Sequence, residues 1–198
     1  MKELEAIQKL ADSFSLFPSV GFKSAERMAY ALLNLSKEDV DLLIKNIEEV
    51  KKNIHPCPNC GILIEGDTCP ICSSSERDHT TCLVLANAKD AISFEKIGSF
   101  NGTYHILNGL INPSKNIGPE DIRIDSLILR IEKEGIKELI IATNGTPEGE
   151  ITALYIAKIL ENKPIKITRL AYGIPIGANF DYLDQLTIEK ALKGRTKI

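Results

Sequence analysis

The sequence contains no tryptophan, and aromatic residues make up only 6% of its 198 residues. So few aromatic rings argue against an extensive surface for stacking bases. The chain also lacks an apolar run near the roughly 18–20 residues that a membrane-spanning helix needs, and we see no secretory signal before its cysteines. We therefore expect a soluble, cytoplasmic protein that does not enter a membrane.

An excess of positive charge is missing as well. The chain has 27 acidic and 24 basic residues and a formal net charge of −3. A nucleic-acid-binding surface would therefore have to be a local patch, or one that oligomerisation repeats. There is also no phosphate-binding glycine loop, and His55, His79 and His105 have no evident serine or cysteine partner. Residue spacing alone therefore identifies no enzyme.

Four of the five cysteines form the strongest motif, which is two Cys-x-x-Cys pairs separated by eight residues. This spacing places four thiolates on two tight turns, and Zn²⁺ favours four sulfurs in a tetrahedron. A disulfide network fits less well because a fifth thiol, Cys82, lies nearby. A redox motif would normally occur once, after a strand. We predict a closed structural zinc site with the ligands Cys57, Cys60, Cys69 and Cys72.

The segment before the cysteines predicts three helices. Apolar residues recur at helical spacing over residues 1–16, and again from about 24 to 33. Ser36 followed by Asp39 resembles a capped helix start with an acidic first turn, so a third helix is expected from there to about Asn53.

The segment after the cysteines alternates between strand and helix patterns. This alternation predicts a mainly parallel sheet with helices on both faces. We expect strands at 81–85, 104–107, 138–143 and 165–169, and helices at 90–97, 122–134, 151–160 and, in the tail, 187–192.

The turn at Phe17–Lys23 is similar to a helix-hairpin-helix turn, in which glycines supply positive φ angles and backbone N–H groups face a phosphate. Ser19 stands where the first glycine of such a turn is expected. Lys23 and Arg27 are four residues apart, so they would share one helical face and could hold a sugar–phosphate backbone. An ordinary helical hairpin with two solvated cations fits the spacing equally well.

Three acidic residues are expected at the carboxyl ends of the parallel strands, which is the usual ligand-binding edge of such a sheet. Asp90 opens the helix after the first strand, and Glu148 and Glu150 lie in the loop that follows Thr143. Together they could hold Mg²⁺. Alternatively, they are helix N-terminal acids stabilised by the macrodipole, by about 0.3–1 kcal/mol each. That alternative explains Asp90 and Glu148 better than the close Glu-Gly-Glu spacing.

In this order, the features resemble the RecR family of bacterial recombination mediators over nearly the whole chain. The similar motifs are Lys23-Ser24-Ala25-x-Arg27-Met28-Ala29, the cysteine pairs followed by Ser75-Glu76-Arg77-Asp78, Gly118-Pro119-Glu120-Asp121-Ile122, Ala142-Thr143-Asn144 with Glu148-Gly149-Glu150, Ala171-Tyr172-Gly173-Ile174-Pro175-Ile176-Gly177, and the final set Asp184, Thr187, Ala191 and Gly194-Arg195.

The resemblance implies a multidomain α plus α/β protein. Its expected parts are a helix-hairpin-helix domain at 1–54, a zinc finger with one Zn²⁺ at 55–78, a Toprim-type domain at 79–170 and a C-terminal tail with a Walker-B-like stretch at 171–198.

The resemblance also implies a function in recombinational DNA repair. Proteins of this family form tetrameric rings on DNA and act with RecO or RecF to help load RecA on single-stranded or gapped DNA. It follows that Lys23 and Arg27 would contact DNA, which could be single-stranded, gapped or duplex. Asp90, Glu148 and Glu150 would bind RecO, and the protein would be associated with the nucleoid.

Two departures from the Toprim pattern argue against catalysis. Ala86 stands where catalytic Toprim proteins carry a glutamate, and alanine cannot transfer a proton. Thr143-Asn144-Gly145 replaces their Asp-x-Asp motif. We therefore expect no enzyme activity. The alternatives are a divergent Mg²⁺-dependent nuclease or primase-like enzyme that uses the three acids, and a zinc-stabilised scaffold that binds only protein.

Overall fold

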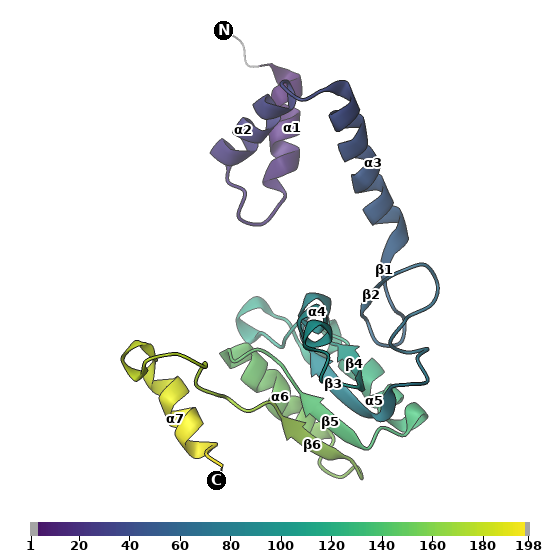
Figure 1. The fold of residues 1–198 in the computed structure, drawn as a ribbon, viewed down its shortest axis with the longest axis vertical. Helices are drawn as coiled ribbons and strands as arrows, with labels where there is room; N and C mark the ends of the chain where they lie inside the picture. Colours follow the sequence, from purple (N-terminus) through teal and green to yellow (C-terminus); the bar gives the residue numbers. More distant parts are fainter. Residues whose placement is uncertain (1–3, 197–198) are drawn as a thin grey trace. The chain divides into compact units, whose positions relative to one another are not determined.

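The computed structural model describes residues 4–196 (Figure 1). The chain divides into two compact units, Met1–Ile54 and His55–Ile198. Each unit has its own hydrophobic core, with one cluster of buried side chains in the first and two in the second. Within residues 4–196, no helix is long and apolar enough to cross a bilayer.

Within residues 4–54, the first unit consists of three helices, α1 (Glu5–Ser15), α2 (Phe22–Leu32) and α3 (Lys37–Asn53). Helices α1 and α2 pack together around Ala11, Ala25 and Ala29, which are at most 2% exposed. Small side chains at these points let the two helices pack closely. All three helices were predicted, although α1 begins at Glu5, and residues 1–3 of that prediction lie outside the described part.

Helix α3 starts as predicted, because the Ser36 hydroxyl accepts a hydrogen bond of 3.1 Å from the backbone N–H of Asp39. None of its side chains is buried. Leu43, Ile47 and Val50 follow one helical stripe and are 40%, 54% and 59% exposed. The described residues therefore leave the apolar side of α3 uncovered.

The second unit contains a four-stranded sheet in the order β4-β3-β5-β6, and every neighbouring pair is parallel. Parallel pairing requires a crossover between successive strands, and helices supply these crossovers here, as the alternating pattern predicted. The strands of this sheet are β3 (Asp78–Leu85), β4 (Gly102–Ile106), β5 (Glu138–Ile141) and β6 (Lys166–Arg169). A separate pair, β1 (Ile54–Pro56) and β2 (Leu63–Glu65), flanks the first cysteine turn.

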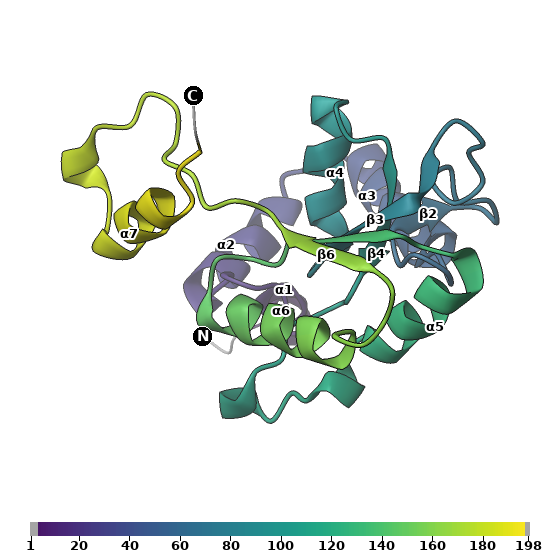
Figure 2. The same ribbon diagram turned by 90° about the horizontal axis from the view of Figure 1, so that it is seen from below.

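Helices cover both faces of the four-stranded sheet (Figure 2). Helices α5 (Ile124–Glu134) and α6 (Pro147–Ile159) pack on the face that receives Cys82 and Val84 of β3. The opposite face receives Leu83 and Leu85, and it is covered by α4 (Ala88–Ile97) together with the cysteine-bearing segment. Alternation along a strand separates these two sets of side chains.

Helix α6 begins at Pro147 rather than at the predicted Ile151. The Thr146 hydroxyl accepts the N–H of Gly149 at 3.2 Å, and proline occupies the first helical position. Both residue types are typical of these positions. Glu148 and Glu150 therefore lie in the first turn of a helix, and their predicted loop location was wrong.

The remaining elements are short. The described part of the chain also forms three 3₁₀ turns, which are η1 (Pro113–Lys115), η2 (Pro119–Asp121) and η3 (Phe180–Tyr182). The tail ends in α7 (Gln185–Lys193), where the Asp184 carboxylate accepts the N–H of Thr187 at 2.9 Å. A helix in the tail was predicted from 187 to 192.

Candidate functional site

The four predicted zinc ligands come together. The Sγ atoms of Cys57, Cys60, Cys69 and Cys72 all lie within 4.8 Å of one another, and those of Cys60 and Cys69 are 3.6 Å apart. Four sulfurs bound at about 2.3 Å to one zinc ion would be about 3.8 Å apart. The donor set and its spacing therefore fit a closed tetrahedral zinc site.

The first cysteine turn is closed by its own backbone. The N–H of Gly61 donates to the Cys57 carbonyl at 2.9 Å, and the N–H of Cys57 donates to the Ile62 carbonyl at 2.7 Å. Gly61 has a φ of 81°, and a Cβ at this position would overlap the Arg123 guanidinium. The left-handed φ of the turn therefore favours glycine, and a side chain here would also displace the Arg123 guanidinium.

The cysteine segment is attached to the rest of the second unit through its own backbone carbonyls. The N–H of Ile106, at the end of β4, donates to the Cys60 carbonyl at 2.7 Å. Arg123 donates to the carbonyls of Pro58 and Asn59 at 2.9 and 3.1 Å. Cys57, Cys60 and Cys69 are at most 6% exposed and belong to the same apolar cluster as Leu83 and Tyr104.

The thiols of this site differ in acidity. The pKa of the Cys72 thiol is lowered to about 5, chiefly because its sulfur accepts a hydrogen bond from Cys60, with further help from the nearby Arg130 charge and the Asn59 amide. The same hydrogen bond, together with burial, raises the pKa of Cys60. These contacts favour the thiolate form of Cys72, and the thiolate is the form that binds metal.

The first half of α2 presents both predicted cations to solvent. Lys23 and Arg27 are exposed on α2. Among residues 4–196, neither one forms an ion pair, and Arg27 makes only a hydrogen bond of 3.3 Å to the Ser24 hydroxyl. The positive φ in the turn between α1 and α2 belongs to Ser19, at 67°, whereas Gly21 has a φ of −78°. Ser19 therefore adopts the positive φ at the position where the first glycine of such a turn was expected.

Backbone N–H groups at the start of α2 are also available. No side chain caps this helix, and its first backbone acceptor, the Gly21 carbonyl, takes the N–H groups of Ser24 and Ala25. Within the described part of the chain, the N–H groups of Gly21, Phe22 and Lys23 have no acceptor. A helix N-terminus of this kind favours anions.

The three predicted acids occupy separate surroundings. Asp90 lies in the first turn of α4, beside a hollow lined by Phe94 and Asn144. Glu148 lies near Ala86 and accepts a hydrogen bond of 3.5 Å from the Asn112 amide. In residues 4–196, the four cysteines are the only group of three or more potential ligands that is close enough to share an ion. The structure does not bring the three carboxylates together around one Mg²⁺.

Glu150 is engaged by three partners. Its carboxylate oxygens lie 2.6 Å from Arg169 Nη1 and 2.5 Å from Lys190 Nζ, and one also accepts the Tyr172 hydroxyl. These contacts, chiefly those with Lys190 and Tyr172, hold the pKa of Glu150 below its usual range. Glu150 therefore connects α6 to the tail, and residue spacing carried no signal of these long-range contacts.

Gly149 explains the close Glu-Gly-Glu spacing. It is buried in the first turn of α6, and a Cβ on this residue would overlap the Asn144 carbonyl oxygen. The glycine is needed for the helix to approach the preceding loop. The macrodipole interpretation, combined with this packing, accounts for the positions of Glu148 and Glu150 without a metal.

The chain is similar to known families over nearly its whole length. Residues 7–51 match the helix-hairpin-helix family of RecR, and residues 54–74 match the RecR zinc finger domain with four cysteines. Residues 80–171 match the Toprim domain family, and residues 173–196 match the C-terminal family of RecR.

Relatives that bear the name "Recombination protein RecR" align with the chain from end to end. The relative from Lactobacillus johnsonii is 40% identical over 193 residues, which is 97% of each chain. Those from Pediococcus pentosaceus and Lactiplantibacillus plantarum are 43% identical over 199 residues, covering 100% of each chain.

A helix-hairpin-helix, a four-cysteine zinc finger and a Toprim domain on one chain define a class of recombination protein. With relatives of this identity over its full length, the chain belongs to the RecR family. The predicted resemblance and fold class are confirmed. Family membership implies a role in recombinational repair, and the helix-hairpin-helix domain suggests an interaction with DNA.

Proposed function

We propose that this chain is a non-catalytic DNA-binding mediator of recombinational repair, which acts with RecO or RecF to help load RecA on single-stranded or gapped DNA. One observation carries the proposal. Lys23 and Arg27 are exposed beside the free N–H groups at the start of α2, among the residues that the structure describes. Two cations and a helix N-terminus together suit a phosphate.

The proposed contact is independent of base sequence. An amide cradle and two flexible cations bind phosphate oxygens, and they carry no pattern of donors and acceptors for reading base edges. With a net charge of −3, the protein needs these few cations repeated in an oligomer to hold DNA at physiological salt.

The experiment replaces Lys23 and Arg27 with alanine and measures DNA binding over a range of salt concentrations. The double variant should bind all sequences more weakly, and its salt slope should fall by about 2 for each protomer that contacts DNA. Lys51→Ala with Lys52→Ala is the matched control, because it removes the same charge from exposed positions in the same unit. Equal binding by the first variant and the parent would leave the hairpin with a structural role only.

We also propose that the Toprim domain is a binding surface and not an active site. Ala86, where an acid would be needed, is 1% exposed and carries no titratable group. Asp90, Glu148 and Glu150 would supply the acidic side chains that receive RecO, although Arg169 and Lys190 already balance the charge of Glu150. Charged residues at the rim of an interface mainly govern the rate of association and its sensitivity to salt.

Asp90→Ala with Glu148→Ala should weaken RecO binding, most clearly at low salt, while zinc content and DNA binding stay at the parent's level. Glu150 is better tested alone, because its removal also frees the tail. If the parent cleaves DNA with Mg²⁺ and the double variant does not, the domain is a divergent nuclease.

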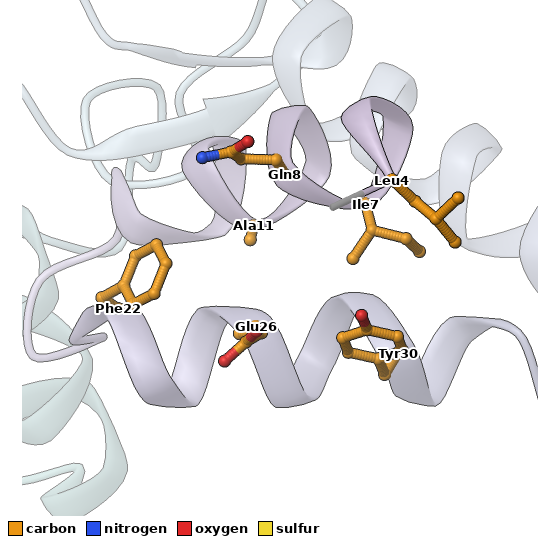
Figure 3. Close-up of a pocket in the computed structure, with 7 residues that line it drawn as sticks. All are labelled: Leu4, Ile7, Gln8, Ala11, Phe22, Glu26 and Tyr30. Carbon is orange, nitrogen blue, oxygen red and sulfur yellow. The ribbon is translucent and has the colours of Figure 1, made fainter. Parts of the chain in front are cut away.

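We further propose a homotetrameric ring, with one Zn²⁺ per chain and with functional parts at 1–54, 55–78, 79–170 and 171–198. The uncovered stripe of α3 supports assembly. So does a groove between α1 and α2 (Figure 3), which is lined by Leu4, Ile7, Gln8, Ala11, Phe22, Glu26 and Tyr30. A DNA-bound ring would place the protein at the nucleoid.

A further inference from the structure

Asn59 joins the two cysteine pairs from outside the metal cage. It lies between Cys57 and Cys60 in the first turn, and its side-chain nitrogen is 3.6 Å from Cys72 Sγ in the second turn. The same nitrogen is 2.7 Å from Glu134 Oε1, at the end of α5. One amide group therefore donates to both a ligand sulfur and a carboxylate.

Glu134 also contacts a buried charge. Its second carboxylate oxygen lies 2.8 Å from Nε of Arg130, a residue that is only 3% exposed. Arg130 also donates through Nη1 to the Tyr104 carbonyl in the middle of β4. The chain of contacts thus runs from Cys72 through Asn59 and Glu134 to the sheet.

One nitrogen of the Arg130 guanidinium is left without a hydrogen bond. Among the described residues, its Nη2 atom is buried and has no hydrogen-bond partner. A buried guanidinium is costly unless negative charge surrounds it, and Glu134 supplies one unit. Zn²⁺ with four thiolates carries a net charge of about −2, and this is the other large negative charge expected near Arg130.

We propose that Asn59, Glu134 and Arg130 form an outer-sphere network that retains zinc in the four-cysteine site and fixes the site to α5 and β4. The Asn59 amide withdraws electron density from the Cys72 sulfur, and Glu134 holds that amide in place. Arg130 orients Glu134 and offsets the negative charge of the cage. Outer-sphere partners of this kind typically change metal affinity by about 10–100-fold.

The test measures the rate at which the zinc-loaded full chain transfers its metal to a chromogenic chelator. Asn59→Ala and Glu134→Gln should each accelerate release by about tenfold or more. The double variant should accelerate zinc release by less than the product of the two single effects, because both residues act through one chain of contacts. Glu132→Gln is the matched control, since Glu132 is on the same helix but pairs with Lys163 at 2.6 Å.

A second readout reports on the ligand sulfur itself. In the Co²⁺-substituted protein, Asn59→Ala should move the thiolate-to-cobalt absorption to lower energy, because the sulfur loses a donor, whereas Glu132→Gln should leave it unchanged. If Asn59→Ala and Glu134→Gln fold, bind one metal ion and release it at the parent's rate, the network has no role at the metal. Zinc content of the parent well below one equivalent would instead contradict the proposed zinc stoichiometry, and with it this inference.

Discussion

At the scale of single residues, His105 is the clearest source of pH dependence. It is fully buried, and its Nε2 donates to the Arg123 carbonyl at 2.9 Å. Burial lowers its pKa to about 4, and the charges of Arg130 and Arg123 add to this effect. The folded chain therefore keeps a neutral imidazole at a pH where an unfolded chain, with a histidine pKa near 6.5, already binds a proton.

We expect the difference between the folded and unfolded pKa of His105 to reduce the free energy of unfolding as the pH falls from about 6.5 to about 4. The total reduction should be up to about 3 kcal/mol. His105→Gln can still donate to the carbonyl but does not titrate, so its free energy of unfolding should fall less over this range. Urea unfolding at several pH values measures the effect.

His79→Gln provides the control, because His79 also bonds to a carbonyl, that of Ser74 at 2.8 Å, but is only partly buried. Acid also displaces zinc from thiolates, and both variants share this effect. If the free energy of unfolding changed with pH in the same way for the His105 variant and the parent, His105 would not be the source of the pH dependence.

Backbone conformation at single residues was the hardest feature to predict. Glycines usually supply the positive φ of a helix-hairpin-helix turn, yet here Ser19 adopts it. Gly21 has open space around its Cβ position. The macrodipole alternative did not explain the close spacing of Glu148 and Glu150, and the steric role of Gly149 between them does. Such roles depend on neighbouring backbone that spacing in the sequence does not specify.

At the scale of elements, one carboxylate makes the ion pair and the hydrogen bond that join the tail to α6. Glu150 binds Arg169 and Lys190, and the Lys190 ammonium also lies 3.8 Å from the Tyr172 ring centroid. Glu150→Gln should therefore free residues 171–196, seen as faster proteolysis and hydrogen exchange confined to the tail at neutral pH. Glu148→Gln changes a neighbouring acid with no contact to the described part of the tail and should leave both rates unchanged.

The same contact should be sensitive to acid. The pKa of Glu150 is lowered in the folded chain. The contribution of Glu150 to the stability of the attached tail is therefore complete above the usual pKa range of glutamate, and it is lost as the pH falls through the lowered pKa. A fluorescent label on the tail of the parent should accordingly gain mobility only in this acidic range. Unchanged mobility there would mean that other contacts hold the tail.

Helices and strands were predictable where local rules decide them. The Ser36 cap, the periodic apolar residues of α1 and α2, and the alternation from β3 to β6 all produced the expected elements. The zinc ligands were predictable because four thiols at this spacing have few other uses. The start of α6 was missed although Thr146 and Pro147 are a typical cap and first residue.

The surroundings of the site could not be predicted in the same way. Arg123 and Glu134 reach the cysteine segment from more than 60 positions away in the sequence. Lys190 is 40 residues from Glu150. No periodicity or motif links such pairs, and only the packed fold brings them together.

At the scale of the whole molecule, the uncovered apolar stripe of α3 predicts assembly. Light scattering should report a tetramer at micromolar concentration, and Ile47→Glu should shift the population to smaller species, because a charge in an apolar interface is costly. Asn46→Glu adds the same charge at the adjacent exposed position and should assemble like the parent. A parent that is monomeric with and without DNA would rule out the ring.

The packing of the cysteine segment limits how the chain can be divided. This segment covers Leu83, Tyr104 and Ile106 on one face of the sheet, where a second helix beside α4 would otherwise be needed. A fragment that begins after residue 78 would therefore expose part of its own interior to water. The finger is not an interchangeable module: evolution or an engineer could not delete it, or replace it with an unrelated finger, without redesigning the sheet face beneath it.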